Sequence, residues 1–341
     1  MDLHSFTCEA YRTGLKIREQ TILRALQGSE PELTAWVRAA GEGDEQLGLD
    51  LQAPQVLEDS LARFADANGC RIEIIGEAFS DRRVVGGSAG ARPQYLVHVD
   101  VIDGTRESMH KVGLSYFEAG ILPWSQDPRL AQTVEGIAIT NGYDPLTGRL
   151  YSYHSSPTGS YRFQEKTKER SELVPTQAQE FNSRGFFNTI TSFRGTGILA
   201  VLKDRLLEAV YGRVTEPDVF HRETLTSCGE LVNLAKGGTR CVMDLRPAVA
   251  FVADKLGIGG YESKAGLCMH PYDVSGSWPI LRDTRGAVLH FYDEQLRQLK
   301  PEDIRLRELD KDIGYIACGN ETLFEKVRGA LRQVLGPDVL R

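Results

Sequence analysis

Two stretches near the start of the chain repeat apolar residues every three or four positions, which is the spacing of an amphipathic helix. The first predicts one or two helices, and its apolar residues are Tyr11, Leu15, Ile22, Leu26, Leu33 and Val37. The second predicts a helix over residues 54–67 through Leu57, Leu61 and Phe64. Asn68-Gly69 follows at once and is typical of a helix end.

The pattern then changes to that of strands. Residues 71–75 alternate between polar and apolar, and residues 95–102 form a longer, mostly apolar run. Residues 133–140 and 150–153 flank the turn-rich segment 141–148, so we expect a hairpin there. The first part of the chain therefore predicts an α+β arrangement.

A polar, weakly periodic stretch over residues 166–194 indicates a junction near residue 190. We therefore expect an N-terminal α+β half, residues 1–190, and a C-terminal α/β half, residues 191–341. The elements predicted in the second half are helices at 198–211, 228–235, 247–256, 273–285 and 321–335, and strands at 240–245, 287–292 and 314–318.

Composition narrows the class of protein. The 341 residues are 41% hydrophobic and 26% charged, as in a globular protein with a substantial core, and the net charge of −7 excludes a nucleic-acid binder. The six cysteines include no C-x-x-C pair, so spacing indicates neither a zinc site nor disulfides, and a reducing cytoplasm is expected. No signal peptide or run of eighteen apolar residues occurs, so we expect no membrane association.

One short segment has the composition of a metal loop. Asp100 and Asp103 lie three residues apart at the end of the apolar strand, and their carboxylates suit hard cations, as does the carbonyl of Ile102. Gly104 lets the backbone amides that follow, including that of Thr105, approach a phosphate. The alternative is an ordinary Asp-Gly turn with Asp103 as its cap.

The order of several further segments decides between these interpretations. The segments are Ile74-Ile-Gly-Glu77, Asp100-Val-Ile-Asp-Gly-Thr105, residues 136–151 with their D-P-x-x-G turn, Cys241-Val-Met-Asp-Leu-Arg246, His270-Pro-Tyr-Asp-Val-Ser-Gly276, residues 283–289 and Ile316-Ala-Cys-Gly-Asn320. Together they resemble the motifs of the inositol monophosphatase superfamily of lithium-sensitive, magnesium-dependent phosphatases. The resemblance spans roughly residues 55–335.

The resemblance implies a fold and a function. The implied fold is a layered α+β and α/β sandwich of the αβαβα type, with the site between its two halves. The implied function is Mg²⁺-dependent hydrolysis of a small phosphorylated metabolite, namely a sugar, inositol or sugar-alcohol phosphate. Two or three Mg²⁺ ions and a homodimer are implied as well.

The resemblance also implies roles for individual residues. The metal ligands would be Glu77, Asp100, the Ile102 carbonyl, Asp103 and Asp273, and the groups that activate the attacking water would be Glu77, Thr105 and Asp103. Substrate would be bound by Gly104, Thr105, Arg106, Ser227, Asp244, Arg246 and His270. Two alternatives stay open: Asp244 and Arg246 form a buried ion pair, and His270 packs behind Tyr272 instead of lining the site.

The chain departs from the family pattern at several positions. Ala78 replaces a second acidic residue, and an aspartate of the preceding helix has no clear counterpart, Asp50 and Glu58 being the candidates. Arg106-Glu107 replaces an asparagine-aromatic pair, and an insertion over residues 247–268 could shape specificity. Two other functions are therefore considered: a nucleotide 3′-phosphate phosphatase, and a catalytically weak relative that binds a phosphorylated ligand or a protein.

Overall fold

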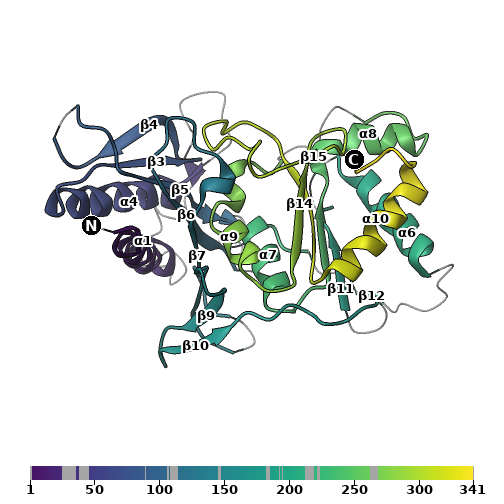
Figure 1. Ribbon diagram of the computed structural model, residues 1–341, viewed down its shortest axis with the longest axis horizontal. Coiled ribbons are helices and arrows are strands. Elements are labelled where there is room, and N and C mark those ends of the chain that lie inside the picture. Colours follow the sequence, from purple (N-terminus) through teal and green to yellow (C-terminus); the bar gives the residue numbers. More distant parts are fainter. Residues whose placement is uncertain are drawn as a thin grey trace.

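The structure is a computed structural model. It describes residues 2–24, 36–37, 46–88, 90–105, 107, 114–144, 147–181, 185–191, 193, 195–211, 219–220, 223–261 and 268–340. Within these residues the chain forms two large sheets and three layers of helices, stacked in the order α, β, α, β, α (Figure 1). The layered sandwich predicted from the sequence is confirmed.

The first sheet is mixed and is built from the N-terminal part of the chain. Its strand order is β10-β9-β8-β7-β6-β5-β3-β4, and the pair β3–β5 is parallel whereas its other pairs are antiparallel. The strands are β3 (Ile72–Gly76), β4 (Phe79–Val85), β5 (Tyr95–Asp103), β6 (Tyr116–Pro123), β7 (Glu135–Thr140), β8 (Tyr151–His154), β9 (Tyr161–Gln164) and β10 (Glu169–Glu172).

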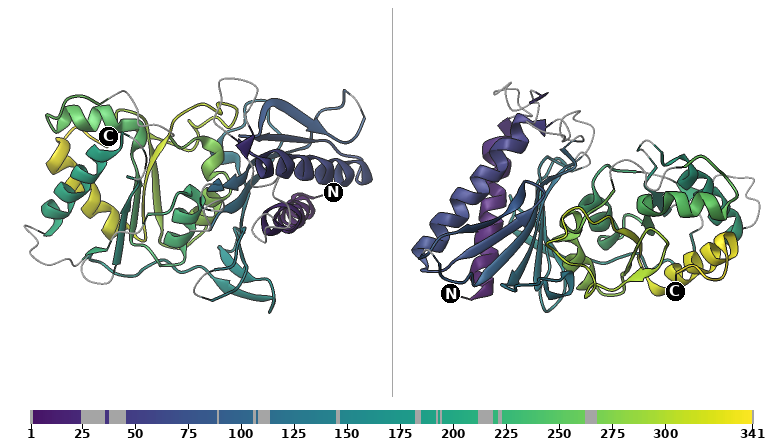
Figure 2. Two further views of the ribbon diagram at one scale, coloured as in Figure 1. Left: turned by 180° about the vertical axis from the view of Figure 1, so that it is seen from behind. Right: turned by 90° about the horizontal axis from the view of Figure 1, so that it is seen from above.

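Two helices cover the outer face of this sheet. They are α1 (Leu3–Ile17), which continues into a π-helical turn η1 (Arg18–Ile22), and α4 (Gly48–Ala67) (Figure 2). Val97, Val99 and Val101 of β5 pack in the same core as these helices. Because successive side chains of a strand point to opposite faces, His98 and Asp100 face the interior of the sandwich.

The second sheet has the order β12-β11-β13-β16-β14-β15. Its strands are β11 (Gly185–Thr189), β12 (Val219–Phe220), β13 (Cys241–Asp244), β14 (Val288–Tyr292), β15 (Gln298–Leu299) and β16 (Gly314–Cys318). Three helices pack on its outer face: α6 (Gly197–Tyr211), α8 (Val249–Lys255) and α10 (Glu321–Leu335). The middle layer between the sheets holds α7 (Ser227–Ala235) and α9 (Ser277–Arg282).

Short elements complete the described chain. They are the antiparallel pair of β1 (Trp36–Val37) and β2 (Gln46–Leu47), and three 3-10 turns, η2 (Leu130–Gln132), η3 (Arg246–Ala248) and η4 (Pro271–Val274). The strands change from the first sheet to the second between Glu172 and Gly185. The division of the chain at residue 190 stays a proposal. No helix in the described part of the chain is long and apolar enough to cross a membrane.

Most predicted elements are present, but several helices differ in extent: α4 begins at Gly48 instead of residue 54, and the helix predicted over residues 247–256 is divided into η3 and α8. The predicted hairpin is formed by β7 and β8, whereas the helix predicted over residues 273–285 is divided into η4 and α9. Pro279 explains the division, because proline in a helix interior clashes with the carbonyl four residues earlier, here that of Ser275. Val37, predicted as helical, lies in β1, and Leu26 and Leu33 lie outside the described residues.

Candidate carboxylate site

The candidate ligands come together where two strands of the first sheet end. β3 and β5 run parallel with Gly76 beside Val99, so Glu77 after β3 and Asp100 in β5 reach the same edge of the sheet. Asp273 arrives from η4, which packs against β5. Burial raises the pKa of Asp100, and the charges of Glu77, Asp103 and Asp273 raise it further. The predicted carboxylates therefore lie close enough for their charges to act on one another, and we call them the carboxylate cluster.

The loop after Asp100 is held by its own backbone. A β-bulge separates Asp100 from Asp103, and Oδ1 of Asp100 accepts the Ile102 N–H over 3.0 Å. The Thr105 hydroxyl donates to the Ile102 carbonyl over 3.0 Å. Gly104 has a φ of +83°, the left-handed region that glycine adopts without strain. The loop is thus a tight turn whose direction depends on Gly104.

Asp103 is fixed by the segment that begins α7. Its Oδ2 accepts a hydrogen bond of 2.5 Å from the Thr226 hydroxyl and one of 2.8 Å from the Cys228 N–H. Burial raises the pKa of Asp103 to about 7, although these hydrogen bonds oppose the shift. Ser227, a predicted substrate contact, lies between these two donors as the first residue of α7.

Asp273 is held by His270, and this bears on the role of that histidine. Oδ2 of Asp273 accepts the His270 N–H over 2.7 Å. The His270 ring lies 5.3 Å from the Tyr272 ring, and its Nδ1 lies 3.3 Å from the Lys311 carbonyl oxygen. The ring therefore packs beside Tyr272, while the His270 backbone positions Asp273.

Asp244 and Arg246 form the buried ion pair that was one of the two alternatives. Arg246 Nε donates to Asp244 Oδ1 over 2.8 Å, and Nη2 donates to Oδ2 over 2.5 Å. The guanidinium lies 4.5 Å from the Phe193 ring centroid. Burial and Asp103 raise the pKa of Asp273, and the charge of Arg246 opposes that shift. Arg246 thus acts on the cluster while paired with Asp244.

The sequence analysis missed Glu118. This residue of β6 is fully buried, and its Oε2 accepts the N–H groups of Gly276 and Ser277 over 3.2 and 3.0 Å. Burial and the charge of Asp103 raise its pKa well above the usual range. A single acidic residue in the otherwise apolar strand Tyr116–Pro123 was the available signal.

Other candidates have different outcomes. Arg106 lies outside the described residues. Glu107 is buried and accepts the Leu225 N–H over 2.8 Å, so it ties the loop to the segment before α7. Glu58, a candidate for the missing helix acid, pairs with Arg83 on the outer layer. Nothing is described of the Asp50 side chain, and of the insertion, η3 and α8 are described but residues 262–267 are not.

The cluster suits a hard cation by its chemistry. Its donors are carboxylate and carbonyl oxygens, the ligands that Mg²⁺ prefers. Glu118 Oε1 is buried with no hydrogen-bond partner in the described structure, so the cluster has unused acceptor capacity. As the side chains stand, no three His, Cys, Asp or Glu side chains among the described residues are arranged as a ligand set. Mutual repulsion between carboxylates opposes a closer approach.

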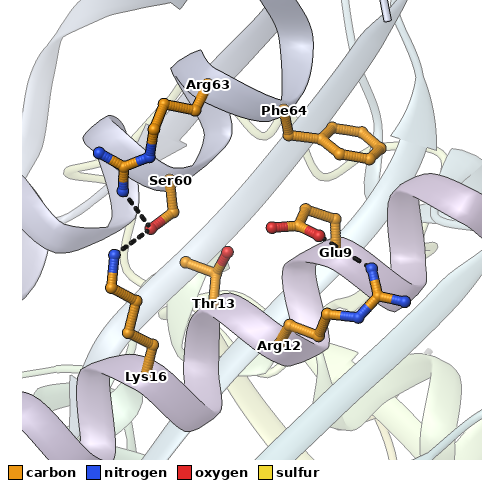
Figure 3. Close-up of a pocket in the computed structure, with 7 residues that line it drawn as sticks. All are labelled: Glu9, Arg12, Thr13, Lys16, Ser60, Arg63 and Phe64. Carbon is orange, nitrogen blue, oxygen red and sulfur yellow. Dashed lines mark hydrogen bonds and ion pairs between the residues drawn. The ribbon is translucent and has the colours of Figure 1, made fainter. Parts of the chain in front are cut away.

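A pocket of about 380 Å³ lies elsewhere, between α1 and α4 (Figure 3). Lys16 Nζ and Arg63 Nη2 both donate to Ser60 Oγ, over 3.2 and 3.4 Å, and Arg12 pairs with Glu9 over 3.0 Å. None of the predicted site residues lines this pocket. It is therefore separate from the candidate site.

The αβαβα layers and the carboxylates at the strand ends can be compared with those of known proteins. No protein-family model and no curated protein matches the sequence. Solved structures match over nearly the whole chain. Fructose-1,6-bisphosphatase from Leishmania major is 15% identical with a TM-score of 0.65, and the match covers 94% of this chain and 92% of that one.

Two further structures agree. The extragenic suppressor protein SuhB from Bartonella henselae is 14% identical with a TM-score of 0.61, over 96% of this chain and 99% of its own. Inositol monophosphatase from Anabaena (Nostoc) is 15% identical with a TM-score of 0.54, over 98% of both chains. The chain therefore has the inositol monophosphatase-like fold, and the resemblance predicted from its motifs is confirmed at the level of the fold.

Proposed function

We propose that the chain is an Mg²⁺-dependent phosphomonoesterase acting on a small phosphorylated metabolite, namely a sugar, inositol or sugar-alcohol phosphate. The observation that carries the proposal is the meeting of Asp100 and Asp103, at the end of β5, with Asp273 of η4. Two proteins of similar fold are named as phosphatases of inositol phosphate and of fructose bisphosphate. The cytoplasmic location and the homodimer implied above belong to the same proposal.

The residues proposed to hold Mg²⁺ are Glu77, Asp100, the Ile102 carbonyl, Asp103 and Asp273. The hydrogen bonds from Thr226 to Asp103 and from His270 to Asp273 fix two of these carboxylates before any ligand arrives. Such outer contacts orient ligands and raise affinity. Bound Mg²⁺ would supply positive charge that stabilises the phosphoryl oxygens. We propose two or three ions.

The chain's own groups have separate tasks in the reaction. Glu77 would accept a proton from the attacking water, and the Thr105 hydroxyl, which donates to the Ile102 carbonyl, would help orient that water. The backbone N–H groups of Gly104 and Thr105 would donate to the phosphate oxygens. The turn at Gly104 supports this task, because its positive φ bends the chain sharply after β5.

The hydroxyl groups of the substrate would contact residues from the second half of the chain. Ser227 lies between the two donors to Asp103, and Arg246 carries positive charge near Asp273. Asp244 would act mainly by holding the Arg246 guanidinium in place. We propose Arg106 and His270 as further contacts of the substrate.

The test is release of inorganic phosphate from a panel of sugar, inositol, sugar-alcohol and nucleotide 3′-phosphates. We expect turnover that needs Mg²⁺, is inhibited by Li⁺ and falls by about 10² to 10⁴ in Asp103→Asn and in Asp273→Asn. The matched control is Asp59→Asn, an exposed carboxylate of α4 that accepts a hydrogen bond from Gln55. This control is expected to keep the wild-type rate.

Three results would redirect the proposal. Turnover that is unchanged by chelation of divalent cations would contradict it. Hydrolysis of nucleotide 3′-phosphates alone would replace the substrate class and keep the chemistry. Binding of a phosphate ester without turnover would favour the catalytically weak relative.

A further inference from the structure

Glu118 lies next to the proposed ligands through the register of two strands. β5 and β6 are antiparallel with Asp100 directly opposite Glu118. Residues in such a pair project from the same face of the sheet, with Cβ atoms about 5 Å apart. The charge of Glu118 acts on the Asp100 carboxylate, and the charges of Asp103 and Asp273 act on Glu118. Glu118 therefore belongs to the carboxylate cluster in space.

The two oxygens of Glu118 are used differently. Oε2 accepts the Gly276 and Ser277 N–H groups, whereas Oε1 has no hydrogen-bond partner within the described chain. The buried Cys228 thiol and the buried Ser277 hydroxyl both lie beside Glu118, but neither makes a hydrogen bond to Oε1 in the described structure, and a thiol is a weak donor. A buried carboxylate oxygen without a strong partner is costly, so a cation near Oε1 would remove that cost.

The side chain cannot easily turn away from the cluster. The turn at Gly276 lies directly on the sheet, since a methyl group on Gly276 would lie 2.4 Å from the Ile137 carbonyl oxygen. A methyl group on Gly120 would lie 2.4 Å from the Ser275 carbonyl oxygen. Because Oε2 satisfies two amides of this fixed turn, rotation of Glu118 would leave both amides unpaired.

We propose that Glu118 is a further carboxylate of the cation site: Oε2 anchors the Gly276–Ser277 turn, and Oε1 contributes to the binding of a hard divalent cation at the Asp100–Asp103 loop. This inference rests on the proposed function. It assigns a cation-binding role to a buried residue of β6, a strand outside the proposed ligand set.

The experiment is calorimetric titration of the full-length protein with Mg²⁺ and with Mn²⁺. Glu118→Gln keeps the size of the side chain and an oxygen for the two amides, but removes the charge. We expect its dissociation constant to rise about 10- to 100-fold. The matched control is Glu73→Gln, because Glu73 of β3 is equally buried but paired with Arg82, Arg307 and Trp124. We expect this control to bind within about twofold of wild type.

The outcomes separate the inference from the proposed function. Unchanged cation affinity in a folded Glu118→Gln protein overturns the inference and leaves the proposed function intact. Cation binding by the wild type without phosphatase activity overturns the function, and the inference is still decided by the variant. A wild-type protein that binds neither cation overturns both. If Glu118→Gln does not fold, Glu118→Asp decides: its side chain is one methylene shorter and cannot both accept the two amides and reach the cation, so we expect weaker binding, and unchanged affinity overturns the inference.

Discussion

The hydroxyl of Thr226 donates a hydrogen bond of 2.5 Å to Oδ2 of Asp103, and this contact joins the end of β5 to the start of α7. The same hydroxyl accepts the Gly229 N–H over 2.9 Å and so caps the helix. Glu107 adds a parallel connection through the Leu225 N–H. The loop with the candidate ligands is therefore joined by two side chains, Asp103 and Glu107, to the segment that begins α7.

Replacing Thr226 should show how much depends on that hydroxyl. Thr226→Val keeps the shape but removes both the donor to Asp103 and the cap of α7. We expect a loss of about 2 kcal/mol in the free energy of unfolding, measured with urea, and at least about tenfold in kcat/KM. Thr226→Ser, which keeps the hydroxyl, is the control. If Thr226→Val and Thr226→Ser had the same free energy of unfolding and the same kcat/KM, the hydrogen bonds of the Thr226 hydroxyl would make no net contribution to either.

Gly120 of β6 should not tolerate a side chain. A methyl group there would lie 2.4 Å from the Ser275 carbonyl oxygen and 2.9 Å from Thr133 Cγ2. We expect Gly120→Ala to lower the free energy of unfolding by about 1 to 3 kcal/mol and to weaken cation binding, because the chain that carries Asp273 must move. Urea unfolding and titration with Mn²⁺ measure the two effects.

The matched control for that substitution is Gly329→Ala. Gly329 lies within α10, is exposed, and has no atom within 4 Å of the position a methyl group would take. Alanine is favoured over glycine in a helix interior, so we expect this variant to gain about 0.5 to 1 kcal/mol. A similar change in both glycine variants would contradict the packing argument.

His154 should make stability depend on pH. Burial, and then Arg170, lowers its pKa to about 4 in the folded protein, compared with 6.5 for the unfolded group. Between these values the unfolded chain binds a proton that the folded one does not, so stability falls as pH falls from 6.5 to 4. We expect His154 to account for about 3 kcal/mol of this loss.

His154→Phe isolates that contribution. The ring packs against Tyr11 and Tyr161, and phenylalanine retains these contacts while losing the hydrogen bond to Ser152. Urea unfolding at pH 7.5, 5.5 and 4.5 should give a shallower decline for the variant than for the wild type. Parallel declines would assign the acid sensitivity to other groups.

The Asp244–Arg246 pair provides a test of buried charge. Asp244→Ala leaves the guanidinium of the buried residue Arg246 without its carboxylate. Removing one partner of such a pair typically costs about 3 to 5 kcal/mol, and we expect a loss in that range by urea unfolding. Asp244→Asn keeps an acceptor and should lose less. A loss below that of the asparagine variant would show that Arg246 finds another partner.

Much of the fold could be predicted because its elements have strong local signals. α10 begins and ends where the apolar spacing predicted, after the cap Asn320 and before Gly336. Several strands, among them β4, β6, β9, β10 and β11, were not predicted. The signal of β10 is weak, because its four residues, Glu169–Glu172, are all polar and exposed. Its pairing with β9 is a property of the sheet rather than of the segment.

The sequence predicts those parts of the candidate site that depend only on the identity of single residues within motifs. Asp100, Asp103 and Asp273 were named from motifs, and the structure brings them together. Glu118 was missed because its importance comes from lying opposite Asp100, and strand register depends on contacts between distant residues. The choice between a substrate contact and an ion pair for Asp244 likewise needed the guanidinium geometry.

Close contact between main chains at Gly120, Gly136 and Gly276 has a consequence for how the site responds to heat. The turn at Ser275 and Gly276 meets the first sheet through backbone atoms, so the distance from the Asp273 segment to Asp100 depends little on side-chain packing. Warming that loosens side chains leaves this spacing in place. We therefore expect cation affinity to persist almost to the melting temperature and to disappear together with the fold.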